Sequence, residues 1–596
     1  VNNKTNAWYA VGNVYAVVDF LKHFTARTSF GGSIDNQYAT NFTFTPYNNS
    51  EGNTNPNSFS EIALYNSNTM WTNTLSYTNA FGKHNLKVIV GSEAIRNYGR
   101  YMIGSASRLF STNFDYLSLS NGTTNITNAS SAYNNTLFSI FSRLDYAYND
   151  KYLVGVTVRR DGSSRFGSNR RYGTFPSVSV GWRLTGEEFL KDVTWLNELK
   201  LRASYGVLGS QNNVSPQNAY TLFGGTFANS YYDIGGNGSL AQGFAQTSIG
   251  NPNTGWEENI VTNAGLDATI LNNKLDVSFE YYQKSINGLL FTQPLPATAG
   301  GATAPTVNIG DIRNKGVDLA LNYRQTINPS LKFNIGANIT TYKNEVVHIP
   351  GPGYFDGANT QNMGNVVRNQ VGQPVSSYFG YQVLGIFKND AEVTASPTQS
   401  GAAPGRFKYA DINGDNKIDA TDRTFLGSPN PDFTYGINLG VTYRNFDFST
   451  ILYGSQGNEI YNTIRSFTHF FSTYVGAKSN DLLNAWTPEN PNSSIPKIES
   501  TGSFSSSGVS NSFYVENGSF LKMRSLMIGY TVQPAILKKF GLNKLRVYAQ
   551  GANLFTLTKY TGLDPELSGN SSAFGIDYAN YPNNQKNFIL GLNLSF

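Results

Sequence analysis

The residues whose types and spacing most clearly suggest ligand binding lie in the run DINGDNKIDATD, which extends from Asp411 to Asp422. Its oxygen-bearing residues fall at positions 1, 3, 5, 7, 9 and 12 of a twelve-residue loop, and they are Asp411, Asn413, Asp415, Lys417 through its main-chain carbonyl, Asp419 and Asp422. Oxygen ligands at these spacings can surround a calcium ion, and Ile418 at position 8 fits the apolar position of such a loop. The run therefore predicts a structural calcium site.

Three features of the same run differ from a standard calcium loop. Asn416 stands in place of the turn glycine, although asparagine tolerates the left-handed conformation that the turn needs. Asp422 is shorter than the usual bidentate glutamate, and the GSPNP that follows excludes an exiting helix. The alternative is a surface turn whose carboxylates bond to the main chain and to water. We expect calcium to act as a clamp in segment 404–432 of a long external loop, and we expect no required cofactor.

Enzymatic motifs are missing from the sequence. It contains no G-x-S-x-G, no H-E-x-x-H and no Walker pattern, and GPGYFDG from Gly351 misses G-x-G-x-x-G by one residue. Only His348 and His469 fall in predicted long loops, and a lone loop histidine is far more often solvated than catalytic. The sequence predicts that the protein is not an enzyme; an outer-membrane hydrolase would have to use one of these two histidines.

The composition is that of a β-rich chain. Aromatic residues make up 14% and charged residues 14%, against about 25% charged in ordinary globular domains, and 58 glycines are present. The net charge of +5 comes from scattered Lys and Arg with no basic run, so nucleic acid is not an expected partner. Cysteine is absent, which excludes a disulfide scaffold and thiolate metal sites and is compatible with an oxidising compartment.

The sequence has no stretch that approaches the 18 consecutive apolar residues of a membrane helix. If the chain crosses a bilayer, it must do so as a closed barrel, because only helices and closed barrels satisfy all their backbone hydrogen bonds in lipid. The first residues, VNNKTNAWYA, do not form a signal peptide. We therefore expect that a signal was removed or that the chain is a fragment.

Alternation of apolar and polar residues predicts seventeen strands, most of them longer than strands of globular proteins. They span 8–20, 24–38, 71–80, 86–102, 136–148, 152–161, 174–184, 199–208, 255–270, 275–291, 313–326, 331–343, 433–443, 446–455, 519–531, 544–556 and 587–596. In clear cases such as LDVSFEYY from Leu275 and KLRVYAQGAN from Lys544, one face suits lipid and the other suits water.

The connections between these strands alternate in length along the chain. Short or medium ones lie at 21–23, 81–85, 149–151, 185–198, 271–274, 327–330, 444–445 and 532–543, and longer ones at 39–70, 103–135, 162–173, 209–254, 292–312, 344–432, 456–518 and 557–586. An outer-membrane barrel shows this parity, with tight periplasmic turns and large extracellular loops. Tyr146, Tyr148 and Tyr152 at one short turn, and Tyr443 and Phe446 at another, predict an interfacial aromatic belt.

The chain ends on the alternating strand NFILGLNLSF, which lacks the charge, proline or bulge that protects a soluble edge strand. We expect its free edge to pair with a strand near the start and so to close a barrel. Because bacterial single-chain barrels have even strand numbers, an odd count of seventeen predicts that the chain is truncated on its N-terminal side.

Long runs of this sequence resemble one family. The run from Val158 to Gln211 closely resembles the corresponding run of SusC/RagA-like TonB-dependent transporters. The resemblance continues, in family order, through NPNTGWEENIVTNAGLD, NIGDIRNKGVDLAL, YFGYQVLGIFKNDAE, GRFKYADINGDNKIDATDRTFLGSPNPDFTYGINLG, YGSQGNEIYN and the final GLNLSF. It covers essentially the whole chain.

This resemblance implies an all-β fold, a transmembrane antiparallel β-barrel with 22 strands in the full-length family. It also implies TonB-dependent import of nutrients across the outer membrane, oligosaccharides first and peptides as the other cargo, together with a SusD-like substrate-binding lipoprotein. Residues 1–596 would be the barrel domain, truncated before the plug and signal peptide, with TonB acting through the missing N-terminal part. The alternative function is a soluble or surface-attached adhesion or scaffold protein built from β domains.

Overall fold

The computed structural model describes residues 3–595 apart from 46–54, 226–229, 237, 293–294, 296–299, 361–362, 538–540, 568, 570–572, 580–581 and 583. Eighteen strands belong to one antiparallel sheet. Each of the seventeen predicted strands overlaps one of them, and the eighteenth is the three-residue β31 (Thr556–Thr558). Among the described residues, no helix is long and apolar enough to cross a membrane.

The chain divides into two compact units. Unit 1 comprises residues 1–181, 204–260 and 288–309, and unit 2 comprises residues 182–203, 261–287 and 310–596. The strands β7 (Tyr172–Arg183), β8 (Leu196–Ser210) and β11 (Glu257–Ile270) contribute residues to both units.

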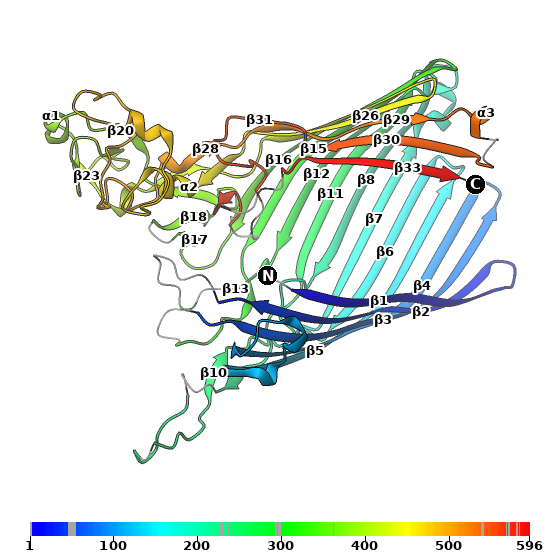
Figure 1. Ribbon diagram of the computed structural model, residues 1–596. Coiled ribbons are helices and arrows are strands. Elements are labelled where there is room, and N and C mark those ends of the chain that lie inside the picture. The colour runs from blue at the N-terminus through cyan, green and yellow to red at the C-terminus, as the bar shows by residue number, and fades with distance from the viewer. Residues whose placement is uncertain are drawn as a thin grey trace. The chain divides into compact units, whose positions relative to one another are not determined.

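Unit 1 is built on an antiparallel meander in which each strand pairs with the next along the chain (Figure 1). Its strands are β1 (Lys4–Phe20), β2 (Phe24–Thr43), β3 (Ser58–Phe81), β4 (His84–Leu109), β5 (Gly122–Tyr148) and β6 (Tyr152–Ser163). We call β2–β6 the strand wall. Two small hairpin-like pairs, β9 (Leu222–Gly224) with β10 (Ala245–Ser248) and β13 (Leu290–Thr292) with β14 (Thr306–Asn308), accompany it.

Unit 2 continues the same pattern of neighbouring antiparallel strands. Its strands are β12 (Leu275–Asn287), β15 (Asp311–Asn328), β16 (Leu331–His348), β25 (Phe433–Tyr443), β26 (Phe446–Gln456), β29 (Phe520–Thr531), β30 (Lys544–Ala552) and β33 (Asn587–Ser595). The last strand, β33, pairs with β30 along one edge. The pairing predicted for its other edge stays a prediction.

Short turns join the strands where the sequence predicts them. Leu21, Lys22, Asn149 and Asp150 adopt positive φ, as does Arg444 in the turn between β25 and β26. Tight hairpins of two residues need this left-handed backbone at the turn, because it matches the right-handed twist of the strands. The short α3 (Pro534–Leu537) lies in the medium connection between β29 and β30.

The longer connections are shorter than predicted in unit 1, because the strands extend into them. The strand β3 begins at Ser58 instead of residue 71 and has 24 residues, and β5 begins at Gly122 instead of residue 136 and has 27 residues. The predicted loops 39–70 and 103–135 are therefore largely strand. Their Asn-, Ser- and Thr-rich sequences lack apolar alternation, and pairing with neighbouring strands keeps them extended.

The long connections of unit 2 fold into a lobe that sequence patterns did not predict. This loop lobe comprises the described residues of 349–432, 457–519 and 559–586, and it lies at the ends of strands such as β26 and β29 that are opposite their short turns (Figure 1). A four-stranded sheet joins β17 (Tyr354–Thr360), β18 (Gly364–Gln370), β19 (Ser377–Gly380) and β24 (Thr424–Gly427), and a three-stranded sheet joins β27 (Glu459–Asn462), β28 (Val515–Asn517) and β32 (Ile576–Asp577).

Shorter elements complete the lobe. They are β20 (Val383–Ile386), α1 (Asp390–Thr394), β21 (Thr398–Gln399), β22 (Phe407–Tyr409), β23 (Lys417–Ile418) and α2 (Ile464–His469). Asn389 caps α1 by accepting a hydrogen bond from the Glu392 main-chain nitrogen at 2.9 Å.

Candidate functional site: the strand wall and the loop lobe

The strand wall has one apolar and one polar face, and its register fixes which residues share a face. Ala26 on β2 pairs with Leu75 on β3, which pairs with Val90 on β4, and the row continues through Ser142 to Val158 on β6. Val90 is 45% exposed and Val158 is 44% exposed. Apolar side chains left open on one face of a sheet are the pattern of a lipid-facing barrel wall.

The opposite face of the wall carries ion pairs. Arg159 on β6 contacts Glu93 on β4 at 2.7 Å and Asp161 at 2.7 Å, and it donates a further hydrogen bond to Ser139 at 2.7 Å. Arg143 on β5 bonds Asp145 at 2.7 Å. Charge-assisted contacts of this kind require water or polar neighbours, so this face suits an aqueous lumen.

The strands of unit 2 repeat the arrangement. Arg202 bonds both Asp267 and Glu280, and Arg546 bonds Asp447 at 2.5 Å. On β15, Arg324 bonds Asp276 on this polar face, whereas Arg313 bonds Glu345 on the opposite face. Most arginines on the polar faces therefore have a carboxylate partner, whereas Arg27 on β2 contacts the ring of Tyr15.

An aromatic belt follows the short turns of unit 1. Phe20 stacks on Phe24 with ring centroids 5.6 Å apart, and Phe24 contacts Tyr77 at 5.0 Å. Further along the belt, the ring contacts are Phe81 with His84, His84 with Tyr146 and Tyr148, and Tyr148 with Tyr152. In unit 2, Phe446 lies 4.9 Å from Tyr530, and Tyr443 beside it is 50% exposed. This confirms the aromatic clusters predicted at these turns.

The loop lobe is organised around a core of buried aromatic side chains. Tyr378, Tyr409, Tyr461 and Tyr514 are each less than 2% exposed, and the phenylalanine at 407 packs among them at 1%. Burial raises the pKa of Tyr378, Tyr409 and Tyr461 because the phenolate form would lose its hydration. These tyrosines therefore remain neutral hydrogen-bond donors.

Those hydroxyl groups tie separate lobe segments together. Tyr378 donates to the Gly575 carbonyl at 2.7 Å, and Tyr461 donates to the Ser510 hydroxyl at 3.0 Å. The strand β27 pairs in parallel with β32 and antiparallel with β28. All three long connections of unit 2 thus share one hydrophobic core.

A buried ion cluster connects β29 to the last connection. Lys522 on β29 is 0% exposed and contacts Asp564 at 3.1 Å and Glu566 at 2.8 Å. Arg524, two residues along the same strand, also bonds Glu566. Sequence reasoning missed these residues, although two cations in the otherwise apolar run FLKMRSL were a signal that buried partners must exist.

The predicted calcium residues form a closed turn in which carboxylates accept main-chain hydrogen bonds. Asp411 accepts from Gly414 at 2.7 Å and from Asn416 at 2.8 Å, and Asn416 has the predicted positive φ of 63°. The fully buried Asp422 accepts from Ile412 at 2.8 Å and from Asp419 at 2.8 Å.

The other residues of that turn bond to one another. Asp415 accepts from Lys417 N at 2.9 Å, and the Asn413 amide donates to Asp415 and Thr421. Hydrogen bonds from Thr421, and then the charge of Lys417, lower the pKa of Asp419 to about 2. Within the described residues, no group of three or more His, Asp or Glu side chains is arranged to hold a metal. Calcium binding by this turn stays a prediction.

The two histidines predicted in long loops have different environments, and His348 in fact ends strand β16. His348 is exposed and lies 3.7 Å from Asp311, whereas His469 at the end of α2 is buried. His469 Nε2 lies 3.2 Å from Asp481, and its Nδ1 lies 3.0 Å from the hydroxyl of Thr468. That hydroxyl also donates to the Ile464 carbonyl, which is the usual helix contact of a threonine. His469 therefore has the environment of a structural histidine.

Apolar side chains are exposed on the lobe next to His469. Phe467 and Tyr474 are 6.5 Å apart at their ring centroids, and Val475 and Leu483 are 82% and 86% exposed. The Lys478 ammonium donates to the carbonyls of Phe467 and Phe470 and thereby closes the end of α2. We call Phe467, Tyr474, Val475 and Leu483 the exposed patch.

Comparison with known proteins gives consistent results. The family described as TonB dependent receptor-like, beta-barrel matches residues 2–554. TonB-dependent receptor P3 of Formosa agariphila is 32% identical over 605 residues, which cover 98% of this chain and 58% of P3. TonB-dependent receptor SusC of Bacteroides thetaiotaomicron is 29% identical over 611 residues, which cover 100% of this chain and 56% of SusC.

Among solved structures, the RagAB peptide transporter superposes with a TM-score of 0.84 at 26% identity, over 100% of this chain and 62% of that chain. The chain thus spans less than two thirds of the length of each of these relatives. A soluble adhesion or scaffold protein would not share this family. The chain belongs to the TonB-dependent receptor β-barrel family, and it is an outer-membrane β-barrel protein of the SusC and RagA type.

Proposed function

We propose that this chain is the barrel part of a TonB-dependent importer that carries oligosaccharides across the outer membrane together with a SusD-like lipoprotein. The observation that carries the proposal is the polar face of the strands. Most of its arginines are bonded to carboxylates, as Arg159 is to Glu93 and Arg202 is to Asp267. Hydroxyl and amide side chains then make up most of the groups left to meet a solute, and these suit an uncharged, hydroxyl-rich cargo.

A peptide cargo is the second candidate. The RagAB structure, at 26% identity, is that of a peptide transporter. Peptides carry charged termini that would need free counter-charges, whereas the arginine–carboxylate pairs on the polar face already neutralise one another. The paired arginines therefore favour the oligosaccharide.

The partner lipoprotein would contact the exposed patch of the loop lobe. Val475 and Leu483 present apolar area beside two aromatic rings, and aromatic residues are enriched at the centres of protein interfaces. The segment that carries Tyr474 and Val475 is anchored beside Phe470, which is buried in the lobe core, and by the hydrogen bonds of Lys478 to the Phe467 and Phe470 carbonyls, which favours a preformed docking surface.

The cargo proposal is tested with the full-length transporter purified from native outer membranes in detergent. Calorimetric titration with pools of oligosaccharides and pools of peptides should give heat of binding only with the oligosaccharides. Binding of peptides alone would overturn the oligosaccharide proposal and support the second candidate.

The partner proposal is tested in the same preparation by native mass spectrometry. A lipoprotein should co-purify with the unaltered protein and be lost from Val475→Asp, while Leu384→Asp on β20, which changes an exposed apolar lobe residue outside the patch, should keep it. Retention of the lipoprotein by Val475→Asp would show that the exposed patch is not its docking surface.

A further inference from the structure

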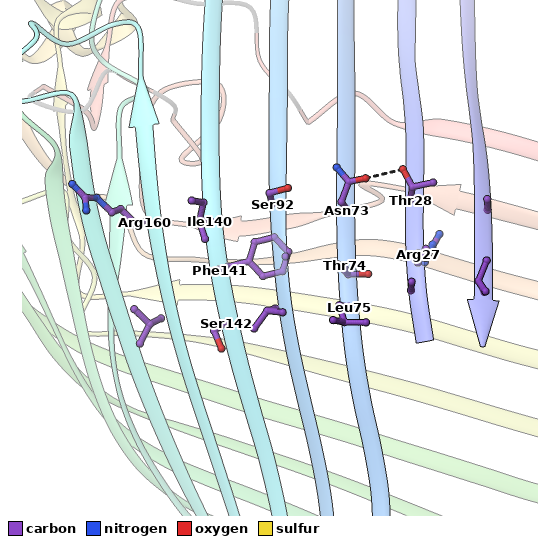
Figure 2. Close-up of a pocket in the computed structure, with 16 residues that line it drawn as sticks. Arg27, Thr28, Asn73, Thr74, Leu75, Ser92, Ile140, Phe141, Ser142 and Arg160 are labelled. Carbon is purple, nitrogen blue, oxygen red and sulfur yellow. Dashed lines mark hydrogen bonds between the residues drawn. The ribbon is translucent and has the colours of Figure 1, made fainter. Parts of the chain in front are cut away.

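The apolar face of unit 1 contains a hollow of about 760 Å³ that extends across β1–β6 (Figure 2). The aliphatic side chains that line it include Val18, Ala26, Leu75, Val90, Ile140 and Val158. Strand register places all of them on the same face. The hollow is therefore an apolar recess on the side of the wall that faces lipid.

An arginine lies at one edge of this recess. Arg160 shares a register row with Ile140, Ser92 and Asn73, so its side chain starts on the apolar face (Figure 2). It is eight residues from Tyr152 in the aromatic belt, which corresponds to about 20 Å along the membrane normal for a strand tilted by ~40°. The apolar band of such barrels is ~25 Å tall, so Arg160 lies near its outer boundary.

A second arginine follows on the same face. Arg96 on β4 donates a hydrogen bond to Asn134 at 3.0 Å and is twelve residues from His84 in the belt, or about 30 Å along the normal. Register and strand spacing put the Cα atoms of Arg96 and Arg160 about 16 Å apart. Both side chains thus lie at the level where the headgroups of outer-leaflet lipids begin.

These two cations have no carboxylate partner within the described residues. Arg160 contacts the ring of Tyr172 at 5.2 Å, and Arg96 contacts the ring of Tyr98 at 6.0 Å. The acidic residues of the strand wall lie on its polar face, namely Asp35, Glu93, Asp145 and Asp161, with one exception. That exception, Glu61, is eight residues beyond the row of Arg96 and accepts a hydrogen bond from Tyr38.

The arginines of the polar face, in contrast, have carboxylate partners: Arg159 and Arg143 each have one at 2.7 Å. A guanidinium at the boundary of the apolar band is only partly hydrated, and an anion from outside the chain would balance its charge. Phosphate matches the planar donor geometry of arginine.

We propose that this site binds a phosphorylated glycolipid of the outer leaflet, with an acyl chain in the recess and phosphate groups on Arg160 and Arg96. Two arginines about 16 Å apart favour a headgroup with two phosphates, because a phospholipid with one phosphate reaches only one of them. The proposal depends on the outer-membrane location and not on the cargo of the importer.

The test uses full-length transporter purified in detergent and titrated with purified lipid A, with bound lipid counted by native mass spectrometry. Arg160→Gln combined with Arg96→Gln should weaken binding by about tenfold or more, since each loses charge-assisted hydrogen bonds to phosphate. Arg160→Lys should bind with intermediate affinity. The control is Lys87→Gln, which removes one exposed cation from the polar face and should leave binding unchanged.

A second variant tests the recess separately. Ala26→Phe fills it without changing a charge and should also weaken lipid A binding, whereas inorganic phosphate should not compete at equal concentration. Heat-modifiable migration on gels shows that each variant retains a folded barrel. If the double variant does not assemble, lipid A affinity is measured instead in Arg160→Lys and in Ala26→Leu. Unchanged lipid A binding in the double variant, or equal loss in Lys87→Gln, would overturn the proposal.

Discussion

The strand wall of unit 1 and the loop lobe of unit 2 bury apolar side chains in opposite ways. In the wall, Ile140 and Val158 are 59% and 44% exposed, whereas Phe407 in the lobe is 1% exposed. The lobe has a core of its own like that of a soluble domain, and the wall has none, because its apolar side chains need lipid as the second layer. The two regions should therefore respond differently to mutation and to solvent.

The largest expected effect is loss of the lobe core. Phe407→Ala removes a ring that contacts Phe470 and Phe513, and it should lower the local unfolding free energy of the lobe by about 3–5 kcal/mol. Hydrogen exchange of lobe amides measures this loss. Val475→Ala, at an exposed lobe position, is the control and should change protection by less than about 0.5 kcal/mol. Equal protection in both variants would contradict an independent lobe core.

The buried ion cluster should be nearly as sensitive. Lys522→Met leaves Asp564 buried without its cation, which should cost about 3–5 kcal/mol in the unfolding free energy of the final connection. Adding Asp564→Leu should restore most of this loss, because a well-packed apolar pair can replace a buried ion pair. Hydrogen exchange of the β31 amides reports the change, and no recovery in the double variant would argue against the pairing.

A charge on the apolar face of the wall comes next. Ile140→Lys should reduce the unfolding free energy in lipid vesicles by about 2–4 kcal/mol, because the ammonium would enter the apolar band. Thr157→Lys, which places the same side chain on the polar face of β6, is the matched control and should have little effect. Denaturant titration in vesicles measures the unfolding free energy of both variants. A larger loss in Thr157→Lys than in Ile140→Lys would show that the lipid-facing and water-facing sides are assigned the wrong way round.

The lobe should also show a small pH dependence that comes from its buried histidine. Burial, and then the charge of Arg465, lower the pKa of His469 below 6.5, while Asp481 at 3.2 Å acts in the opposite direction. The neutral form therefore stabilises the folded lobe fully above pH ~6.5, and this contribution is lost as the pH falls through the lowered pKa. Proteolysis rates between pH 7.5 and 5 should rise for the unaltered lobe, and His469→Gln should remove that dependence.

The smallest expected effect concerns the predicted calcium turn. If Asp411, Asp415 and Asp419 hold calcium, protease cleavage within 404–432 should be slower with the ion than with a chelator. Asp415→Asn should abolish the difference, and Asp390→Asn on α1 should keep it. Identical digestion with and without chelator would contradict calcium binding and would indicate a turn closed by hydrogen bonds alone.

Sequence patterns predicted the strands well, but they predicted poorly the strand ends that extend into the predicted long loops. Alternation places β25 to the residue and β26 within one residue, because apolar and polar positions alternate along both strands. The first part of β5, GTTNITNASSAYNN, has no apolar alternation, and only its register with β4 keeps it extended. Such information lies in the partner strand and not in the segment itself.

The candidate sites were predictable only in part. Asn416 adopts the expected left-handed turn, and the resemblance to SusC and RagA gave the family. The loop lobe was missed, because residues such as Tyr378 and Tyr461 contact partners in other connections, and single-sequence patterns do not reveal such distant pairs. The pairing of Lys522 with Asp564 was missed for the same reason.

Tyr378 donates a hydrogen bond to the Gly575 carbonyl, and β27 pairs with both β28 and β32. The three long connections of the lobe are therefore joined directly to one another. Contacts that join residues about two hundred positions apart form slowly, because a long segment must be closed before any of them is gained. Biogenesis of the lobe must therefore wait for the final hairpin to reach the cell surface. Once the lobe has formed, its three long connections would move as one body, so a force applied to one of them is transmitted to the other two.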